Sequence, residues 1–572
     1  MKKFVLTLAY LTAILSLTSC EDFFTPDSDD ILLEKEYVGD YTELYSGFMG
    51  LAASMQSVAD QASFLEGLRN DLLEPTPNAP REFWDVYNYN DLTDNKLADP
   101  VGYYNIILNV NDYIQHAFAF HEVNPNAVSE SDFNGMIGGA IRYKVWAYLM
   151  LAKIYGEAVF FEETITEYKD ISQYPVYEYD QIIQKCRELM ETGVKGINGL
   201  TETRWSSVLF PGQADSPTNL MWNRICPPSE VLLAEIYLNQ YEYQKAWEQC
   251  VAIIRRGGEN EASYQLNLSE YNGEWKQFGY QFVRKEQITV AFFDFSLKQT
   301  NRYIEYYSNN YPNKYYLRPT QANMNRFASQ SNASGVLNDQ YRGNNVTHKM
   351  VNGEWVLQKF LAAHESADKI HTNDVQITFY RAAEVHLFLI EALVGMGRFE
   401  EALGFLNNGV GSFYNATLGK FNPPFEPYPS CLYRTSSTSE LANRGVRGRV
   451  NLSEVGGFSL QAASALDTLV AIQRMDSLIV EEYALELAGE GKAHYAMNRM
   501  LRRWSVQANK HWASKWIDAT GEQNPADLWG TKVQNYWAEK IGAKYTNGNG
   551  PAVTAELQSG LDKWFINYDL KN

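Results

Sequence analysis

Cysteine and histidine are scarce in this sequence, which has five cysteines and eight histidines among 572 residues. Four of the cysteines are widely separated, no C-x-x-C pair occurs, and no pair of histidines lies nearby. A structural zinc site needs such ligands at close spacing, so we expect no metal centre. A single disulfide is an alternative if the protein resides in an oxidising compartment. Dispersed cysteines in a long chain are, however, more often small buried apolar residues. These four are Cys186, Cys226, Cys250 and Cys431.

Long apolar runs are also absent after the first twenty residues. The stretch from Val385 to Met396 is the nearest candidate, but it is short and contains Glu391. A bilayer-spanning helix needs about 20 apolar residues, so this stretch predicts a buried helix instead. We therefore expect a body without membrane spans.

Basic residues are too few to balance the acidic ones. The chain has 49 Lys and Arg against 69 Asp and Glu, for a formal net charge of −20. Nucleic-acid binding depends on basic side chains that neutralise phosphates, so we expect no nucleic-acid partner. The same charge disfavours adhesion to anionic lipid headgroups, and most of it is expected on a solvated surface.

The signatures of common enzyme classes are missing as well. His364-Glu365 is followed by His371, which is not the H-E-x-x-H spacing of a metalloprotease helix. Gly135–Gly139 lacks the preceding strand and the following Lys-Ser/Thr of a phosphate-binding loop, and no G-x-S-x-G occurs. We predict a protein that is not an enzyme and uses no cofactor. A glycosidase with an unrecognised carboxylate pair stays open as an alternative.

The N-terminus, by contrast, carries a recognisable pattern. Lys2 and Lys3 precede an apolar stretch from Phe4 to Leu17, and Leu17-Thr18-Ser19-Cys20 then places small residues before a cysteine. This pattern resembles the lipobox of bacterial lipoproteins, in which the cysteine is lipidated and becomes the first mature residue. We predict a signal peptide at 1–19, lipidation of Cys20, and a flexible acidic tether at 20–35. The only membrane contact would then be the lipid anchor.

Apolar residues recur at helical spacing through most of the remaining chain, which predicts a mainly α core. Two helical hairpins resemble tetratricopeptide units, because in each an aromatic-x-x-Ala sequence opens the second helix: Tyr243–Ala246 and Phe399–Ala402. Isolated hairpins are the alternative. Short strands are expected at Gln287–Phe295 and Trp355–Phe360. The helices are expected within Tyr37–Met55, Tyr103–Phe120, Ile141–Tyr155, Val231–Ile254, Tyr380–Leu406 and Ala465–Trp504.

Long stretches between these helices, at 61–100, 196–228, 257–345 and 407–460, are predicted to be irregular, and such loops are usually functional or built into local subfolds. Aromatic residues gather there. Trp84 lies among Asp and Asn, and six tyrosines fall within fourteen residues: Tyr303, Tyr306, Tyr307, Tyr311, Tyr315 and Tyr316. A tyrosine offers a flat apolar face and a polar edge, which suits a sugar ring or an extended peptide. Packing of these rings against the helices, in a repeat scaffold with no small ligand, is the alternative.

Several short motifs are distributed over the chain after the N-terminal segment. They are Tyr104-x-x-Ile107-x-x-x-Asn111, Ala140–Arg142 with Leu151–Gly156, Tyr316–Thr320, Asp339–Arg342, and Asp476–Glu482 with Glu486–Gly491. Together they resemble the SusD/RagB family of outer-membrane lipoproteins, and the resemblance covers nearly the whole mature chain. The C-terminal motif departs from the family at Tyr483 and Ala484, where arginines are usual, so ion pairs inferred from the family there stay open.

The resemblance implies a single SusD-like domain over 36–572, with an N-terminal part at about 36–256 and a C-terminal part at about 257–572. It implies tetratricopeptide-like hairpins as a scaffold, long loop-rich insertions and a minor β component. It implies a cell-surface protein that captures an oligosaccharide and delivers it to a SusC-like TonB-dependent transporter, or a peptide in RagB-like members. Mapped onto this chain, the family's ligand site implies Arg69, Asp71, Trp84 and the tyrosines from Tyr303 to Tyr316.

Overall fold

The structure is a computed structural model, and it describes residues 39–165, 173–256, 264–266, 279, 285–364, 366, 368–370, 372, 374–423, 425–433, 443–456, 465–504, 525–546 and 548–568. The predicted signal peptide, the lipidation site Cys20 and the tether at 20–35 lie outside the described residues.

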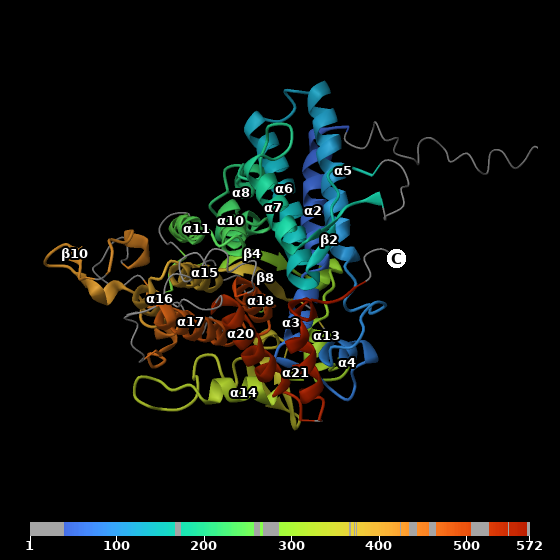
Figure 1. Cartoon of the computed structure of the whole chain (residues 1–572). Coiled ribbons are helices and arrows are strands. Elements are labelled where there is room, and N and C mark those ends of the chain that lie inside the picture. Colours follow the sequence, from blue (N-terminus) through green and yellow to red (C-terminus); the bar gives the residue numbers. More distant parts are fainter. Residues whose placement is uncertain are drawn as a thin grey trace, which may run out of the picture.

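Three long helices form the N-terminal part of the molecule and stand side by side in Figure 1. The first begins at a capping box, in which the Asp40 side chain accepts a hydrogen bond from the backbone N–H of Glu43 at 3.0 Å. The third ends at Gly156, whose φ of +76° suits a glycine at a helix C-terminus. These helices are α2 (Tyr41–Ser57), α5 (Val101–Val123) and α6 (Glu130–Tyr155), and α7 (Tyr179–Glu191) packs on α6.

The two predicted tetratricopeptide-like hairpins are confirmed. The first consists of α10 (Ser229–Asn239) and α11 (Tyr243–Arg256), and the second of α15 (Ala382–Gly395) and α16 (Phe399–Leu406). Ala246 and Ala402 are fully buried, as expected of small residues where two helices approach closely. The hairpins are adjacent, since α11 packs on α15 and the Tyr243 ring lies against Gly395.

The C-terminal helices lie below these hairpins in Figure 1, and the first of them packs on α15 and α16. The predicted helix over Ala465–Trp504 is interrupted at Gly489 and Gly491, both with positive φ. The predicted helix Tyr380–Leu406 begins too early, because Tyr380 and Arg381 belong to the strand that precedes α15. The helices here are α17 (Ala465–Glu486), α18 (Ala493–Arg503), α20 (Pro525–Gly542) and α21 (Gly550–Ser559).

The described strands are short and pair antiparallel in five two-stranded sheets, which confirms the minor β component. The expected strand at Gln287–Phe295 is β4, which ends at Phe292, and the one at Trp355–Phe360 is β7 followed by a 3-10 turn. The hairpin of β9 and β10 projects at the left in Figure 1. The pairs are β1 (Leu73–Pro75) with β5 (Leu317–Pro319), β2 (Glu157–Val159) with β3 (Val176–Glu178), β4 (Gln287–Phe292) with β8 (Gln376–Arg381), β6 (His348–Val351) with β7 (Glu354–Leu357), and β9 (Tyr414–Asn415) with β10 (Lys420–Phe421).

The stretches predicted to be irregular contain short helices, so that prediction was wrong in part. Helices of one or two turns have too few periods to be recognised in the sequence and depend on tertiary packing. The α-helices are α3 (Gln61–Arg69), α4 (Arg81–Tyr87), α8 (Trp205–Leu209), α9 (Pro217–Leu220), α13 (Tyr303–Tyr307) and α14 (Gln321–Ala328). The 3-10 helices are η3 (Met221–Arg224), η5 (Phe295–Leu297), η6 (Gln358–Phe360), η7 (Gly411–Phe413), η8 (Ser430–Leu432), η9 (Gly448–Val450) and η10 (Leu561–Trp564).

One continuous hydrophobic core runs from Leu44 to Ile566, and it contains a buried network of ion pairs. Glu486 at the end of α17 is fully buried and lies 2.7 Å from Arg342 and 2.8 Å from Arg381, with Arg449 also paired to it. Two of these residues, Arg342 and Glu486, belong to motifs that carry the family resemblance. The ion pair between them joins the end of α17 to the middle of the chain.

Within the described residues, no helix has both the length and the apolar character needed to cross a membrane. The four cysteines among the described residues, Cys186, Cys226, Cys250 and Cys431, are buried free thiols. Burial raises the pKa of Cys186 and Cys250 well above the usual range, which keeps both thiols protonated.

Candidate ligand-binding site

The tyrosine-rich segment from Tyr303 to Tyr316 begins as α13 and ends just before β5, which pairs with β1. Two of its tyrosines lie in the core. Tyr303 and Tyr307 are fully buried, and each packs against Phe64 of α3 with ring centroids 5.5 and 5.8 Å apart. Burial raises the pKa of both phenols well above the usual range. These two side chains therefore fix α13 on α3 and do not face solvent.

Tyr306 and Tyr316 are only partly buried and meet at the surface of the same segment. Their ring centroids are 5.1 Å apart, and each lies 5.3 Å from the ring of Phe83 on α4. Trp84, the next residue on α4, is also partly buried and stands edge to face with Tyr87 at 6.1 Å. We call the partly exposed Trp84, Tyr306 and Tyr316, together with the buried Phe83 that contacts both tyrosines, the aromatic patch. In Figure 1, α4 and α13 lie close together at the lower right.

Charged side chains border the aromatic patch. Lys314 is exposed, forms an ion pair with Glu305 at 2.7 Å, and places its Nζ 5.7 Å from the centre of the Tyr316 ring. Arg302 pairs with the buried Asp60 on the other side of α13. The patch thus combines flat apolar faces with hydrogen-bonding groups at its edge, as a site for a polar ring would require.

The remaining tyrosines of the segment differ from each other in exposure. Tyr311 is 92% exposed at the tip of the segment. Tyr315 is buried, donates a hydrogen bond to the carbonyl oxygen of Trp355 at 2.7 Å, and has its pKa raised to about 12 by burial. Tyr315 therefore connects the segment to β7, and only Tyr311 is as open as a free surface residue.

A polar cavity of about 300 Å³ lies where this segment meets the hairpin of β6 and β7. Ser308, Asn309 and Asn310 line one wall, and Lys349 and Gln358 contribute to the other. The Asn309 amide donates to the carbonyl oxygen of Val351 at 2.5 Å, but its buried Oδ1 has no hydrogen-bond partner among the described residues. A ligand hydroxyl could satisfy that acceptor.

Arg69 and Asp71 do not reach this surface. Arg69 stacks on Tyr89 at 3.9 Å and donates to the carbonyl oxygen of Lys563 at 2.8 Å, while Asp71 pairs with Arg326 at 2.5 Å. Burial alone would raise the pKa of Asp71, but Arg326 and Lys540 hold it below its usual value. Both side chains are buried and bound to protein atoms, which differs from the open hydroxyl-binding residues expected. Their assignment to the ligand site stays a prediction without support in this arrangement.

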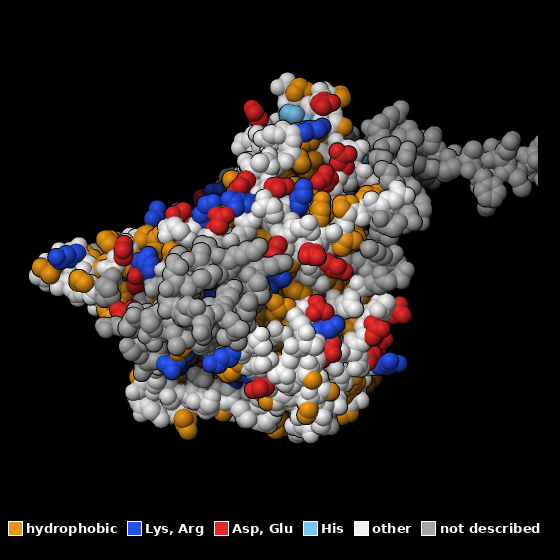
Figure 2. Space-filling view, viewed as in Figure 1, with side chains coloured by type: hydrophobic (Ala, Val, Ile, Leu, Met, Phe, Trp, Pro, Cys, Tyr) orange, Lys and Arg blue, Asp and Glu red, His pale blue; other side chains and the backbone are white. Residues whose placement is uncertain are grey.

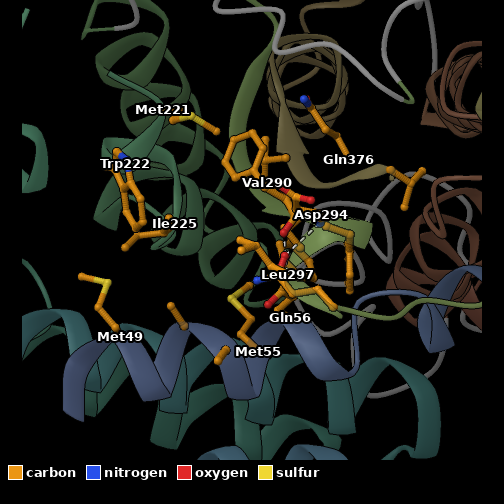
Figure 3. A pocket seen from close by; sticks show the side chains of 18 of the residues that line it. Met49, Met55, Gln56, Met221, Trp222, Ile225, Val290, Asp294, Leu297 and Gln376 are labelled. Carbon is orange, nitrogen blue, oxygen red and sulfur yellow. Dashed lines mark hydrogen bonds between the residues drawn. The ribbon is translucent and has the colours of Figure 1, made fainter. Parts of the chain in front are cut away.

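An apolar pocket of about 630 Å³ was missed by the sequence reasoning. In Figure 3, Met49, Met55 and Gln56 on α2 form its floor, and Trp222 and Ile225 stand to one side of it. The Gln56 side chain donates to the carbonyl oxygen of Phe292 on β4, which closes one end. The sequence carries only a weak indication of this pocket, because Trp222 and its neighbours come from a stretch without helical periodicity.

Comparisons with known proteins identify the fold. No model of a known protein family matches the sequence, and no curated protein matches it either. Solved structures do match: a SusD superfamily protein from Bacteroides vulgatus is 14% identical with a TM-score of 0.55, over 86% of this chain and 95% of that chain. A SusD homolog from Bacteroides thetaiotaomicron is 12% identical with a TM-score of 0.54, over 86% and 92%.

The chain has the SusD-superfamily fold. A third structure with this fold is surface glycan-binding protein A from Bacteroides fluxus, 13% identical with a TM-score of 0.51, over 80% of this chain and 88% of that chain. The fold and its helical, tetratricopeptide-like architecture are thereby confirmed. In this SusD-like chain, the aromatic patch, the polar cavity and the apolar pocket are the candidate ligand sites.

Proposed function

We propose that this SusD-like chain is a cell-surface lipoprotein that binds oligosaccharides and delivers them to a SusC-like TonB-dependent transporter of the outer membrane. The observation that carries the proposal is the accessible aromatic patch on α4 and the 303–316 segment. The proposal covers binding and transfer only, with no catalytic step and no cofactor.

Stacking of sugar rings on aromatic side chains would supply the binding energy. The apolar C–H face of a sugar fits against Trp84, Tyr306 or Tyr316, and each aromatic contact adds about 0.5–1.5 kcal/mol beyond the buried area. Lys314, Glu305 and the Asn309 Oδ1 atom would bond the hydroxyls. A few such contacts give modest affinity, which suits capture followed by release.

Similarity in fold supports the ligand class. Surface glycan-binding protein A from Bacteroides fluxus shares the fold and, by its name, binds glycans. We extend that activity to this chain as part of the proposal, because the aromatic patch offers the surface that a glycan needs. Buried tyrosines alone would have favoured a helical scaffold without a small ligand, but Tyr306, Tyr311 and Tyr316 are at least partly exposed.

Lipidation of Cys20 would hold the protein at the outer membrane beside its transporter. Each buried methylene of an acyl chain contributes about 0.8 kcal/mol, so several chains give a nearly permanent anchor. Cys20 and the tether that follows it lie outside the described residues, and the anchor is proposed from the sequence alone.

Peptide uptake, as in RagB-like proteins, is the second candidate. The apolar pocket between α2, η3 and β4 favours it, because a pocket lined by Met49, Met221 and Trp222 can accept apolar side chains of many shapes. Sugars present few groups that would fill it.

Calorimetric titration of the mature chain with glycan and peptide panels tests the two ligand classes. For a glycan, Trp84→Ala and Tyr316→Ala should each weaken binding at least several-fold, and Trp222→Ala should leave it unchanged. For a peptide, the effects should be reversed. Unchanged glycan binding in both patch variants would remove the aromatic patch from the site. Release of a shorter sugar from the bound glycan would contradict a purely binding function.

A further inference from the structure

A second polar cavity, of about 320 Å³, lies between α6, α8, η3 and the end of α11. Four arginines line it in a chain whose net charge is −20: Arg142, Arg204, Arg224 and Arg256. We call this cavity the arginine pocket. Figure 2 shows Lys and Arg side chains gathered with acidic ones in the region of α8 and α10.

Among the described residues, carboxylates pair with only two of the four arginines, and one of these carboxylates, Glu202, also lines the pocket. Arg204 pairs with Asp215 at 2.7 Å, and Arg256 pairs with Glu230 at 2.7 Å and with Glu202. In the part of the chain that the structure describes, no carboxylate forms an ion pair with Arg142 or Arg224. A buried guanidinium without an anion is costly, so the pocket carries positive charge that a ligand could neutralise.

The same pocket collects hydrogen-bond donors without acceptors. Nε of Arg142 and Nε1 of Trp205 are buried and unpartnered among the described residues, and both side chains are at least 97% buried. Nε of Arg224 and Oγ1 of Thr203 are also buried and unpartnered. Guanidinium and indole groups only donate, so the missing partner must be rich in acceptor atoms.

The fold holds these donors in place. Arg142 donates from Nη1 to the carbonyl oxygens of Gly199 and Thr201 at 3.0 and 2.5 Å. The segment that carries Thr203 lies directly on α6 because Gly135 has no side chain, and a Cβ there would come within 1.7 Å of the Thr203 hydroxyl.

Aromatic contacts fix two further walls of the arginine pocket. Trp205 stacks on Phe48 with centroids 4.2 Å apart, and the Arg224 guanidinium lies 5.3 Å from the centre of the Tyr264 ring. The donors are therefore preorganised on rigid elements, which lowers the cost of ordering them around a ligand.

We propose that the arginine pocket binds an oxyanion, either a free sulfate or phosphate or the carboxylate of an acidic sugar. Guanidinium groups bind such planar or tetrahedral oxyanions with short charge-assisted hydrogen bonds, often in pairs. The volume lies at the lower end of the range of small-molecule sites, so there is room for a sugar unit as well as for an inorganic ion. The proposal is independent of glycan binding at the aromatic patch.

Thermal shift and calorimetry on the mature chain test this proposal, with sulfate, phosphate and glucuronate as probes. Chloride at equal ionic strength and glucose are the controls. We expect saturable stabilisation by an oxyanion and none by the controls. Binding of sulfate or phosphate identifies a free ion as sufficient, and binding of glucuronate alone identifies an acidic sugar. No stabilisation above the controls by any of the three probes overturns the proposal.

Variants locate the binding. Arg224→Gln removes a guanidinium group with its charge, and Trp205→Phe removes the indole N–H while its phenyl ring keeps the stacking on Phe48. Each variant should lower the affinity for the oxyanion roughly tenfold, because each loses a charge-assisted hydrogen bond to it. Arg398→Gln, a partly buried arginine before α16 that pairs with Glu401, is the matched control and should change nothing. Unchanged affinity in both folded pocket variants would overturn the assignment.

Discussion

Glu486 is the residue at which three buried arginines meet, so its charge contributes to stability. Burial alone would raise its pKa, but Arg449, Arg381 and Arg342 hold the pKa well below its usual range. A carboxylate with a lowered pKa stabilises the fold above its unfolded pKa of about 4.3, and this stabilisation is lost as the pH falls below that value.

The first prediction concerns this carboxylate. Glu486→Gln should lower the free energy of unfolding by about 3–5 kcal/mol at pH 7, because it leaves buried arginines uncompensated. Denaturant unfolding at pH 7, 5 and 3.5 measures the effect, and the gap to the wild type should narrow only at the lowest pH. Glu188→Gln removes an exposed partner of the partly buried Lys185 and should cost less than 1 kcal/mol. Equal losses in the two variants would show that burial of the network is unimportant.

Glu66 on α3 should behave in the opposite way. Burial raises the pKa of this carboxyl to about 7, although the backbone N–H of His494 donates to its Oε1 at 3.0 Å. Because the pKa is raised, its contribution to stability is full below the unfolded pKa of 4.5 and is lost as the pH rises toward 7. The ionised side chain is thus a cost at neutral and alkaline pH.

The second prediction follows from that cost. Glu66→Gln should raise the free energy of unfolding at pH 8, by at most about 3 kcal/mol for a pKa that moves from 4.5 to about 7, and should have little effect at pH 4. Unfolding curves at the two pH values measure it. Asp71→Asn is the opposite control: its pKa is lowered by Arg326, so the variant should be destabilised at pH 8. A loss of stability in Glu66→Gln at pH 8 would contradict the assignment.

At the scale of elements, the packing between helices determines whether a helical glycine can be replaced by a larger residue. At the contact between α11 and α15, a Cβ on Gly395 would come within 2.3 Å of the Tyr243 ring, whereas a Cβ on Gly50 of α2 would meet nothing within 4 Å. The same substitution should therefore have opposite effects at these two helical glycines.

We expect Gly395→Ala to lower the free energy of unfolding by about 1–3 kcal/mol, because the added methyl group overpacks the junction of the two hairpins. Gly50→Ala should raise it by up to about 1 kcal/mol, because alanine has the higher helix propensity. Thermal and denaturant unfolding of both variants measure the difference. Similar effects at the two positions would mean that the hairpins are not tightly packed at Gly395.

Elements with several turns of clear periodicity could be predicted, and short ones could not. The helices α2 and α5 and both hairpins could be predicted from the sequence because their apolar residues repeat over three or more turns. By contrast, α13 has five residues, and its burial depends on Phe64, which is distant in sequence.

For the same reason, the sequence could locate the tyrosine-rich segment but could not divide its residues between core and surface. Which tyrosine faces inward depends on where α3, α4 and β7 pack against it. The arginine pocket was equally hidden, since Arg142, Thr203 and Arg224 come from three segments that are separate in the sequence.

At the scale of the whole molecule, the aromatic patch lies on other elements than the two pockets, which share η3. The aromatic patch is built on α4 and α13, and the arginine pocket on α6, α8, η3 and α11. The apolar pocket lies between α2, η3 and β4. Since Trp84 and Trp222 belong to separate sites, loss of one site should leave the other intact, and the ligand classes can be assigned one site at a time.

The last prediction concerns the attachment of the whole molecule to the membrane. If lipid on Cys20 is the only anchor, Cys20→Ala should move the protein from the membrane fraction to the soluble fraction of cells that process lipoproteins. Ligand affinity of the released protein should equal that of the mature chain, because the described binding surfaces lie in the folded body. Cys250→Ala, in the buried core, is the control and should remain with the membrane. A Cys20→Ala protein that still sediments with membranes would require another anchor, and the acyl chains would then not account for its position.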